Sequence, residues 1–442
     1  MRLNYYLAKG SLVGALGGLL FGFDTAVISG TTQQLSQVYS LSSFNLGVTV
    51  SIAVIGAVIG AMSSGELGQK IGPRQALRIM ALLYLLSSLG CAFAWNWPAL
   101  IVFRFLGGLG IGGSSVLGPV YIAELAPAKW RGRLVGLFQI NIVIGILLAY
   151  ASNYVIAIVN SGSTEWRWQL GIAAIPAGLF LALLYGIPRS SRWLVTQSRI
   201  DEARKVLQLM GSPNSEEELQ EIIASIHLER TSSKEPLFQK KYRLPIFLAV
   251  TIGLFNQLSG INAILYYLPS IFHSAGFSKL SGEKQAVLVG AMNLIATLLA
   301  MSVIDKLGRK TLLLIGSVGT AISLAGVAAI FYTQRGESML LWYLIGFIFF
   351  FGISQGSVIW VYLSEVFPTK VRSKGQSLGS SSHWIMNAAL SLLFPIVAQY
   401  SKATPFVFFA AMMALQFFIV LFVYPETKGI TLEQMQHKLG IE

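Results

Sequence analysis

The chain has 442 residues, of which 54% are hydrophobic and 12% are charged, and its formal net charge is +13. An average soluble domain carries about 25% charged residues, so this chain has too little charge to cover a water-facing surface. A net positive charge also suits nucleic-acid binding, and the placement of the basic residues decides that question.

Twelve apolar segments are long enough to span a bilayer, because roughly 30 Å of hydrocarbon require about 20 helical residues. The first follows Arg2 and Lys9 without a small-residue cleavage site, which favours a spanning helix over a secretion signal. In chain order the predicted spans lie near residues 11–30, 44–66, 76–94, 98–121, 133–159, 168–187, 244–272, 284–304, 311–333, 340–364, 376–399 and 404–424.

Basic residues alternate between the loops. Arg104 lies inside a span, and the odd loops hold only Arg167, Lys279, Lys284, Arg335 and Lys402 of the 32 Lys and Arg residues. Because basic loops stay in the cytoplasm, both termini and residues 188–243 are predicted to be cytoplasmic. The positive charge then reflects membrane topology, and we expect the lipid bilayer, and no nucleic acid, as a partner.

A polar stretch, residues 198–235, divides the spans into two sets of six. Its acidic run from Glu216 to Glu221 precedes Ile222, Ile223 and Ile226 at helical spacing, which predicts short amphipathic helices at the cytoplasmic surface. The predicted domains are an N-terminal six-helix bundle (1–187), a cytoplasmic linker (188–243), a C-terminal six-helix bundle (244–424) and a cytoplasmic tail (425–442).

The two halves share a sequence repeat. YIAELAPAKWR at residues 121–131 aligns without a gap with YLSEVFPTKVR at residues 362–372. Parallel repeats around a central site are typical of transporters that rock between two states. The sequence therefore predicts an all-α membrane protein with two pseudo-symmetric six-helix bundles.

Asp24 and Arg104 are charged residues within predicted spans. An ionised group at membrane depth is costly unless it is paired, and the two spans run in opposite directions, so the two side chains can meet. A carboxylate that can lose its partner is suited to carry a proton. A permanent structural salt bridge between two helices is the alternative.

Charged residues also recur at the predicted cytoplasmic ends of the fourth and tenth spans. Glu124 with Arg131 in the first half corresponds to Glu365 with Arg372 in the second. Their recurrence favours a symmetric set of ion pairs that closes the cytoplasmic side, whereas a single such pair would be an ordinary helix-end charge.

Uncharged polar residues interrupt the seventh span, FNQLSGINAILYYLP, and recur elsewhere in the spans. Amides inside a span are costly without partners. Amides together with aromatic faces, and no fixed cation, suit a neutral sugar, although helix-to-helix hydrogen bonding and interfacial anchoring are the alternatives. The residues concerned are Asn256, Gln257, Asn262, Tyr266, Gln139, Asn293, Trp360 and Trp384.

Motifs of other functions do not fit this chain. Gly108, Gly110 and Gly113 spell a dinucleotide-binding pattern but lie in a spanning run, where small residues let helices approach closely. The four histidines lack metal-ligand spacing, and neither a phosphate-binding loop nor a nucleophile elbow is present. We therefore expect no metal, no cofactor and no enzymatic activity.

Seven segments together resemble the sugar porters of the major facilitator superfamily, over essentially the whole chain. They are GGLLFGFDTAVISG (17–30), RFLGGLGIG (104–112), YIAELAPAKWRG (121–132), QLSGIN (257–262), DKLGRK (305–310), SEVFP (364–368) and PETKG (425–429). The resemblance implies the major facilitator fold and alternating access to a central sugar site.

Site residues follow from the resemblance. Asp24 and Arg104 match the pair associated with proton symport, and Asp305 and Arg309 join the gating set. The sugar-contacting positions are Phe21, Gln139, Gln257, Asn262, Tyr266, Asn293, Gly356, Trp360 and Trp384. The sequence departs from the family at Asn256, Ser357, His383, Gln69 and Pro73. Of these, Asn256 and His383 lie at the expected sugar site.

The expected function is proton-coupled import of a hexose or pentose by a monomeric protein of the cell membrane. A facilitative sugar uniporter is the first alternative, although such relatives usually carry an amide in place of Asp24. A membrane sugar sensor is an alternative of another class, and such a protein would usually have a long cytoplasmic tail. Only about 18 residues follow Tyr424.

Overall fold

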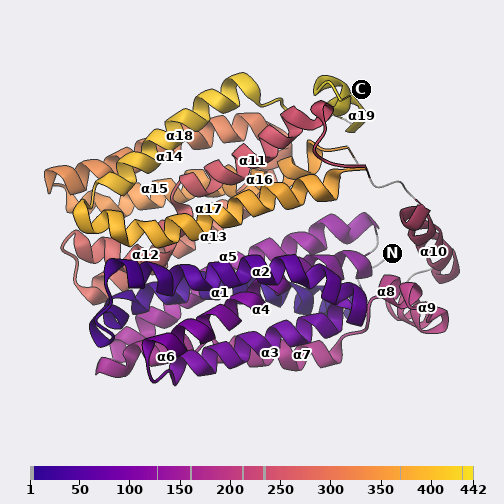
Figure 1. Cartoon of the computed structure of the whole chain (residues 1–442), viewed down its shortest axis with the longest axis horizontal. Coiled ribbons are helices and arrows are strands. Elements are labelled where there is room, and N and C mark those ends of the chain that lie inside the picture. Colours follow the sequence, from indigo (N-terminus) through magenta and orange to yellow (C-terminus); the bar gives the residue numbers. More distant parts are fainter. Residues whose placement is uncertain are drawn as a thin grey trace. The chain divides into compact units, whose positions relative to one another are not determined.

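The computed structural model describes residues 4–126, 128–159, 162–211, 214–231, 235–368, 370–430 and 432–441, excluding the side chains of 128, 129, 131, 132, 228–231, 432 and 433. Helices account for all regular structure in this described part of the chain (Figure 1). Within these described ranges, twelve segments are long and apolar enough to cross a membrane. This number confirms the twelve predicted spans.

Nine of these spans are single helices, and the other three are assembled mainly from two helices each. The single helices are α1 (Tyr5–Val38), α2 (Ser43–Ile71), α3 (Pro73–Ala92), α4 (Trp97–Leu125), α5 (Ala128–Val159), α13 (Lys279–Leu307), α14 (Arg309–Thr333), α17 (Arg372–Tyr400) and α18 (Thr404–Val423). The spanning part of α5 is Arg133–Val159. The composite spans are α6 (Glu165–Gly171) with α7 (Ala174–Leu183), α11 (Arg243–Leu258) with α12 (Ile261–Ser274), and α15 (Leu340–Ile353) with α16 (Gln355–Glu365).

The chain divides into two compact units. The first comprises Met1–Asp24, Ile52–Ala149 and Trp166–Ser233, and the second comprises Thr25–Ser51, Tyr150–Glu165 and Lys234–Glu442. This division follows contacts and passes through α1, α2 and α5, so the domain boundaries expected from the sequence stay a prediction.

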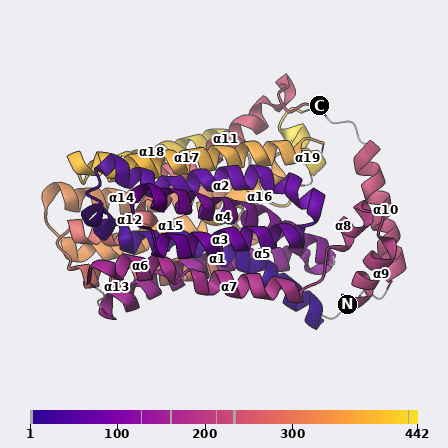
Figure 2. The same cartoon turned by 60° about the horizontal axis from the view of Figure 1, so that its bottom comes forward.

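Within the first unit, α3 packs along α4 and α7, as Figures 1 and 2 show. Glycines on α4 permit an equally close approach to α2. A Cβ atom at Gly108 would lie 2.1 Å from the carbonyl oxygen of Ala53, and one at Gly112 would lie 2.0 Å from that of Ala57. The apparent dinucleotide motif therefore serves helix packing, as predicted.

Within the second unit, two predicted spans are interrupted. α11 and α12 meet at Gly260, which adopts a left-handed conformation (φ 83°) that glycine accepts without strain. α15 and α16 meet at Ser354 (φ −118°, ψ −96°). Both spans were expected to be continuous, and these breaks differ from that expectation. Broken spans at membrane depth occur where backbone lines a cavity or a binding site.

The first span is longer than predicted, because α1 continues to Val38 instead of ending near residue 30. The hydroxyl groups of Thr31 and Thr32 donate hydrogen bonds to the carbonyl oxygens of Ile28 and Ser29 in the preceding turn, so these polar residues are satisfied within the helix. Polarity alone therefore did not end the helix.

The linker forms α8 (Ser191–Thr196), α9 (Ile200–Leu209) and α10 (Ser215–Thr231), in agreement with the predicted short helices. Their apolar residues form a small core of their own, in which Leu194, Leu207 and Leu219 are buried. Arg204 and Glu216 join α9 to α10 through an exposed ion pair of 2.8 Å. Outside the linker, a further short helix, α19 (Leu432–Lys438), follows α18 near the C-terminus.

Candidate functional site

The predicted pair of intramembrane charges is formed. Arg104 Nη1 on α4 donates a hydrogen bond of 2.8 Å to Asp24 Oδ1 on α1, and both residues belong to the first unit. The Arg104 side chain is 4% exposed and that of Asp24 is 15% exposed. Each charge therefore has the partner that its position in an apolar span requires.

This ion pair rests on one short bond. The Nε atom of Arg104 is buried and has no hydrogen-bond acceptor among the described residues. A bidentate arginine–carboxylate pair would engage two parallel N–H groups and would bind more strongly. The geometry is therefore compatible with a pair that separates.

A network of amide side chains surrounds the break in the seventh span. Asn262 Nδ2 donates to Gln257 Oε1 at 3.0 Å, and Gln257 Nε2 donates to Asn256 Oδ1 at 3.1 Å. Gln257 Nε2 also lies 3.3 Å from each ring nitrogen of His383 on α17. The structure thus brings together four predicted sugar-site residues from three helices.

A second polar group links α12 to α17. Asn387 Nδ2 lies 3.5 Å from the hydroxyl oxygen of Tyr266, and its Oδ1 accepts a bond of 3.1 Å from Ser391. Tyr267 donates to the backbone carbonyl of Ser391 at 3.0 Å. The sequence analysis missed Asn387. The available signal was an amide in an apolar run, four residues and thus about one helical turn after His383.

Aromatic surfaces adjoin the amide network. The ring of His383 lies 5.3 Å from that of Trp360 and 5.4 Å from that of Trp384, measured between centroids. Trp360 on α16 is 41% exposed, so part of its face is open. Flat apolar surface beside amide groups is therefore present in the second unit.

The other predicted sugar-site residues lie on α1, α5, α13 and α16. Asn293 on α13 is 7% exposed, and Gly356 lies in the first turn of α16, just after the break at Ser354. Phe21 on α1 and Gln139 on α5 belong to the first unit and are half-buried.

Sequence reasoning also missed a buried pair behind the second break. Gln355 Nε2 donates to Gln416 Oε1 on α18 at 2.7 Å, and both side chains are 1% exposed. Asn256 Nδ2 donates to the backbone carbonyl of Gln355 at 3.3 Å. Because this chain of contacts joins the two helix breaks, it fixes one relative to the other.

Three of the predicted gating residues of the second half, Asp305, Arg309 and Glu365, form a cluster around Arg309. Its guanidinium donates to Glu365 at 2.9 and 3.2 Å and lies 3.1 Å from Asp305. Thr427 donates to Glu365 at 2.6 Å. Arg309 is 10% exposed and Asp305 81%, so the contact with Glu365 is the better shielded of the two.

The remaining predicted gating residues lie at the ends of α4, α5 and α16–α17. Arg372 Nε lies 3.4 Å from the backbone carbonyl of Phe367. Glu124 lies near the end of α4, and the side chain of Arg131 lies outside the described residues, so the first-half pair stays a prediction. Among the described residues, no group of three His, Cys, Asp or Glu side chains is placed to hold a metal ion.

Comparisons with known proteins agree on one family. The model of the family described as "Sugar (and other) transporter" matches residues 10–439. The D-xylose-proton symporter of Escherichia coli (strain K12) is 36% identical, over 98% of this chain and 95% of that protein. The glucose transporter GlcP of Staphylococcus epidermidis is 36% identical, over 99% of this chain and 98% of that protein.

A solved structure supports the same relationship. The inward open conformation of the xylose transporter XylE from Escherichia coli has a TM-score of 0.87 and 35% sequence identity, covering 98% of this chain and all of that one. The predicted resemblance and fold class are thereby confirmed. The chain belongs to the sugar (and other) transporter family, and it is a twelve-span membrane transporter with the major facilitator fold rather than an enzyme.

Proposed function

We propose that the chain imports a neutral monosaccharide, a pentose or a hexose, together with protons by alternating access. Two observations support this proposal. The relatives include proteins named for D-xylose with protons and for glucose. This chain has an ion pair held by one short hydrogen bond in its spans, and a cluster of amides beside aromatic rings.

The buried Asp24–Arg104 pair carries the proton-coupling part of the proposal. A proton that binds Asp24 removes the negative charge that holds Arg104 at 2.8 Å, and its release restores the pair. Because both side chains are shielded from water, formation or loss of this single bond substantially changes the free energy with which α1 packs against α4. A proton can therefore bias which conformation is favoured.

The amide network carries the sugar-binding part. Gln257 and Asn262 offer uncharged donors and acceptors at the break between α11 and α12, and Trp360 offers a partly open ring. Sugars present hydroxyl edges and apolar faces, which these two kinds of groups match. No fixed cation takes part in the network, which favours a neutral substrate over an anionic one.

The other predicted sites serve the same cycle. We assign sugar contacts also to Phe21, Gln139, Asn256, Tyr266, Asn293, Gly356, His383 and Trp384, and gating to Glu124, Arg131, Asp305, Arg309, Glu365 and Arg372. Both termini lie in the cytoplasm in this proposal, as the distribution of basic residues favours, and the protein acts as a monomer in the cell membrane.

A facilitative uniporter is the second candidate. The buried Asp24–Arg104 pair is also what a permanent link between α1 and α4 would look like. In that case Asp24 and Arg104 join α1 to α4 permanently, and sugar moves only down its own gradient. The two candidates differ in whether a pH gradient drives accumulation.

Counterflow in proteoliposomes separates these possibilities. A panel of radiolabelled pentoses and hexoses is tested with and without an imposed pH gradient, for the wild type and Asp24→Asn. Exchange in both proteins, with accumulation only in the wild type, is the expected result. Exchange without accumulation in the wild type would establish the uniporter, and no exchange of any sugar would overturn the substrate class.

A further inference from the structure

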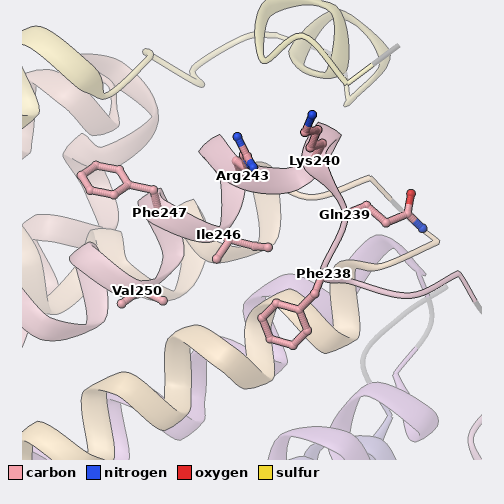
Figure 3. A pocket seen from close by; sticks show the side chains of 7 residues that line it. All are labelled: Phe238, Gln239, Lys240, Arg243, Ile246, Phe247 and Val250. Atoms are coloured by element: carbon pink, nitrogen blue, oxygen red, sulfur yellow. The ribbon is translucent and has the colours of Figure 1, made fainter.

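A groove at the start of the seventh span is separate from the transport site. It is shallow and open, has a volume of about 630 Å³, and is lined by Phe238, Gln239, Lys240, Arg243, Ile246, Phe247 and Val250 (Figure 3). All seven residues belong to the second unit. The groove combines two basic side chains with a run of apolar ones.

The apolar side of the groove is an outward face of α11. Arg243 and Phe247 are four residues apart, as are Ile246 and Val250, so the four lie on one side of the helix. Phe247 is exposed on this side, whereas Ile246 and Val250 are half-buried and Ile246 borders the core. The opposite face, including Leu248 and Ile252, is buried against α16, α17 and the C-terminal tail.

The exposed aromatic rings at the groove face the surroundings of the protein. Phe238 is 78% exposed and Phe247 is 43% exposed. Phe247 lies within the span Lys240–Ser274, where such a face contacts acyl chains, whereas Phe238 lies just before that span.

The basic side of the groove lies at the end of the span. Lys240 and Arg243 are exposed, and neither side chain has an ion-pair or hydrogen-bond partner among the described residues. Their nitrogen atoms point to the same side in Figure 3, away from Phe238. The neighbouring Lys241 is already paired with Glu235, so Lys240 and Arg243 are the cations that remain for a ligand.

We propose that this groove binds one anionic phospholipid from the leaflet at the N-terminal end of α11. The phosphodiester pairs with Lys240 and Arg243, and an acyl chain runs along Ile246, Phe247 and Val250. Charge complementarity favours this occupant, because basic pockets at the ends of spanning helices attract anionic headgroups, while the apolar face below them suits a lipid tail and not a free ion.

Native mass spectrometry of the full-length protein in detergent tests the site. The protein is titrated with phosphatidylglycerol and with phosphatidylcholine of the same acyl chains, for the wild type and for Lys240→Gln/Arg243→Gln. Each basic residue near an anionic lipid contributes a factor of about five in affinity. The double variant should therefore bind phosphatidylglycerol roughly 10- to 30-fold more weakly and lose its preference over phosphatidylcholine.

A matched control removes the same charge elsewhere in the second unit. Lys284→Gln/Arg335→Gln replaces two exposed basic residues that lie outside the groove and should retain the preference. A phosphatidylglycerol with a photoreactive acyl chain should label residues 238–250 in the wild type. Equal thermal stability of all variants shows that they are folded.

Three outcomes would overturn the proposal. The first is equal affinity of the wild type for the two lipids, which indicates ordinary lipid contact. The second is an unchanged preference in Lys240→Gln/Arg243→Gln, or label elsewhere in the chain. The third is displacement of the lipid by soluble glycerophosphate, which would indicate a site for a free phosphate group.

Discussion

Asp24 and Arg104 form a hydrogen-bonded ion pair of 2.8 Å between α1 and α4, in which the arginine is 4% exposed and the carboxylate 15%. Neither residue can be replaced alone without leaving a shielded charge uncompensated. This relationship determines how variants of the pair should behave, independently of any transport assay.

Arg104→Gln should lower stability more than the double variant Asp24→Asn/Arg104→Gln. Loss of one partner of a buried pair costs about 3–5 kcal/mol, whereas loss of both leaves two neutral groups that can hydrogen-bond. Thermal unfolding of the four proteins of this cycle in detergent measures the coupling. Additive effects of the two single variants would show that the pair contributes no coupling energy.

Gln257→Ala should weaken sugar binding by about tenfold or more. The substitution removes a proposed sugar contact and leaves Asn262, which donates to Gln257 at 3.0 Å, without that acceptor. A buried polar group deprived of its partner costs about 1–3 kcal/mol. Titration calorimetry with a transported sugar gives the Kd directly.

Ser382→Ala is a suitable control for this variant. Ser382 precedes His383 on α17, but its hydroxyl group donates only within its own helix, to the carbonyl oxygen of Leu378. Its replacement should leave the Kd within about twofold of the wild type. An equal loss of affinity in both variants would indicate a general disturbance of the packing between α11 and α17 and argue against a specific role of Gln257.

The sequence was sufficient to predict the features that depend on single residues in an unusual setting. Asp24 and Arg104 stand out because charges are rare in apolar spans, and Gln257 and Asn262 because amides are. The relation between Glu365 and Arg309 was less accessible, since the two residues are 56 positions apart and come together only through packing of α14 and α16. Gly260 was visible, but its left-handed conformation, and with it the helix break, depends on the surrounding packing.

Glu365→Gln should reduce the rate of sugar transport with little change in sugar affinity. Arg309 donates two hydrogen bonds to this carboxylate, which joins the start of α14 to the end of α16. Since the cluster is separate from the amide network, its loss should alter conformational exchange and not binding. Initial rates in proteoliposomes, together with the Kd for the sugar, distinguish the two effects.

Asp305→Asn provides a comparison at the same arginine. Asp305 is 81% exposed, and an exposed ion pair contributes about 0–1 kcal/mol, so its replacement should change the rate less than Glu365→Gln does. A larger effect of Asp305→Asn, or a matching loss of sugar affinity in Glu365→Gln, would contradict the assigned role of the Arg309–Glu365 contact.

Glu426→Ala should destabilise the start of α14. The N-cap of this helix is Gly308, which has no side chain to accept from the first N–H groups, and a Cβ atom there would lie 2.6 Å from Glu426 Oε2. Glu426 instead accepts from the backbone N–H groups of Arg309 at 2.9 Å and Lys310 at 3.0 Å. Loss of a helix cap costs about 0.5–2 kcal/mol.

This cap should also depend on pH. Partial burial by itself raises the pKa of the Glu426 carboxyl group, but hydrogen bonds from the backbone N–H groups of Lys428, Arg309, Lys310 and Thr427 outweigh it and lower the pKa. A lowered pKa stabilises the folded protein above the ordinary carboxyl value of about 4.3, and this contribution is lost as the pH falls through the lowered value.

Thermal unfolding of the wild type and Glu426→Gln between about pH 7 and pH 3.5 measures this contribution. The difference in Tm should be largest near neutral pH and shrink in acid. A Tm difference for Glu426→Gln that stays constant across this range would mean that the charge of Glu426 does not contribute to the cap.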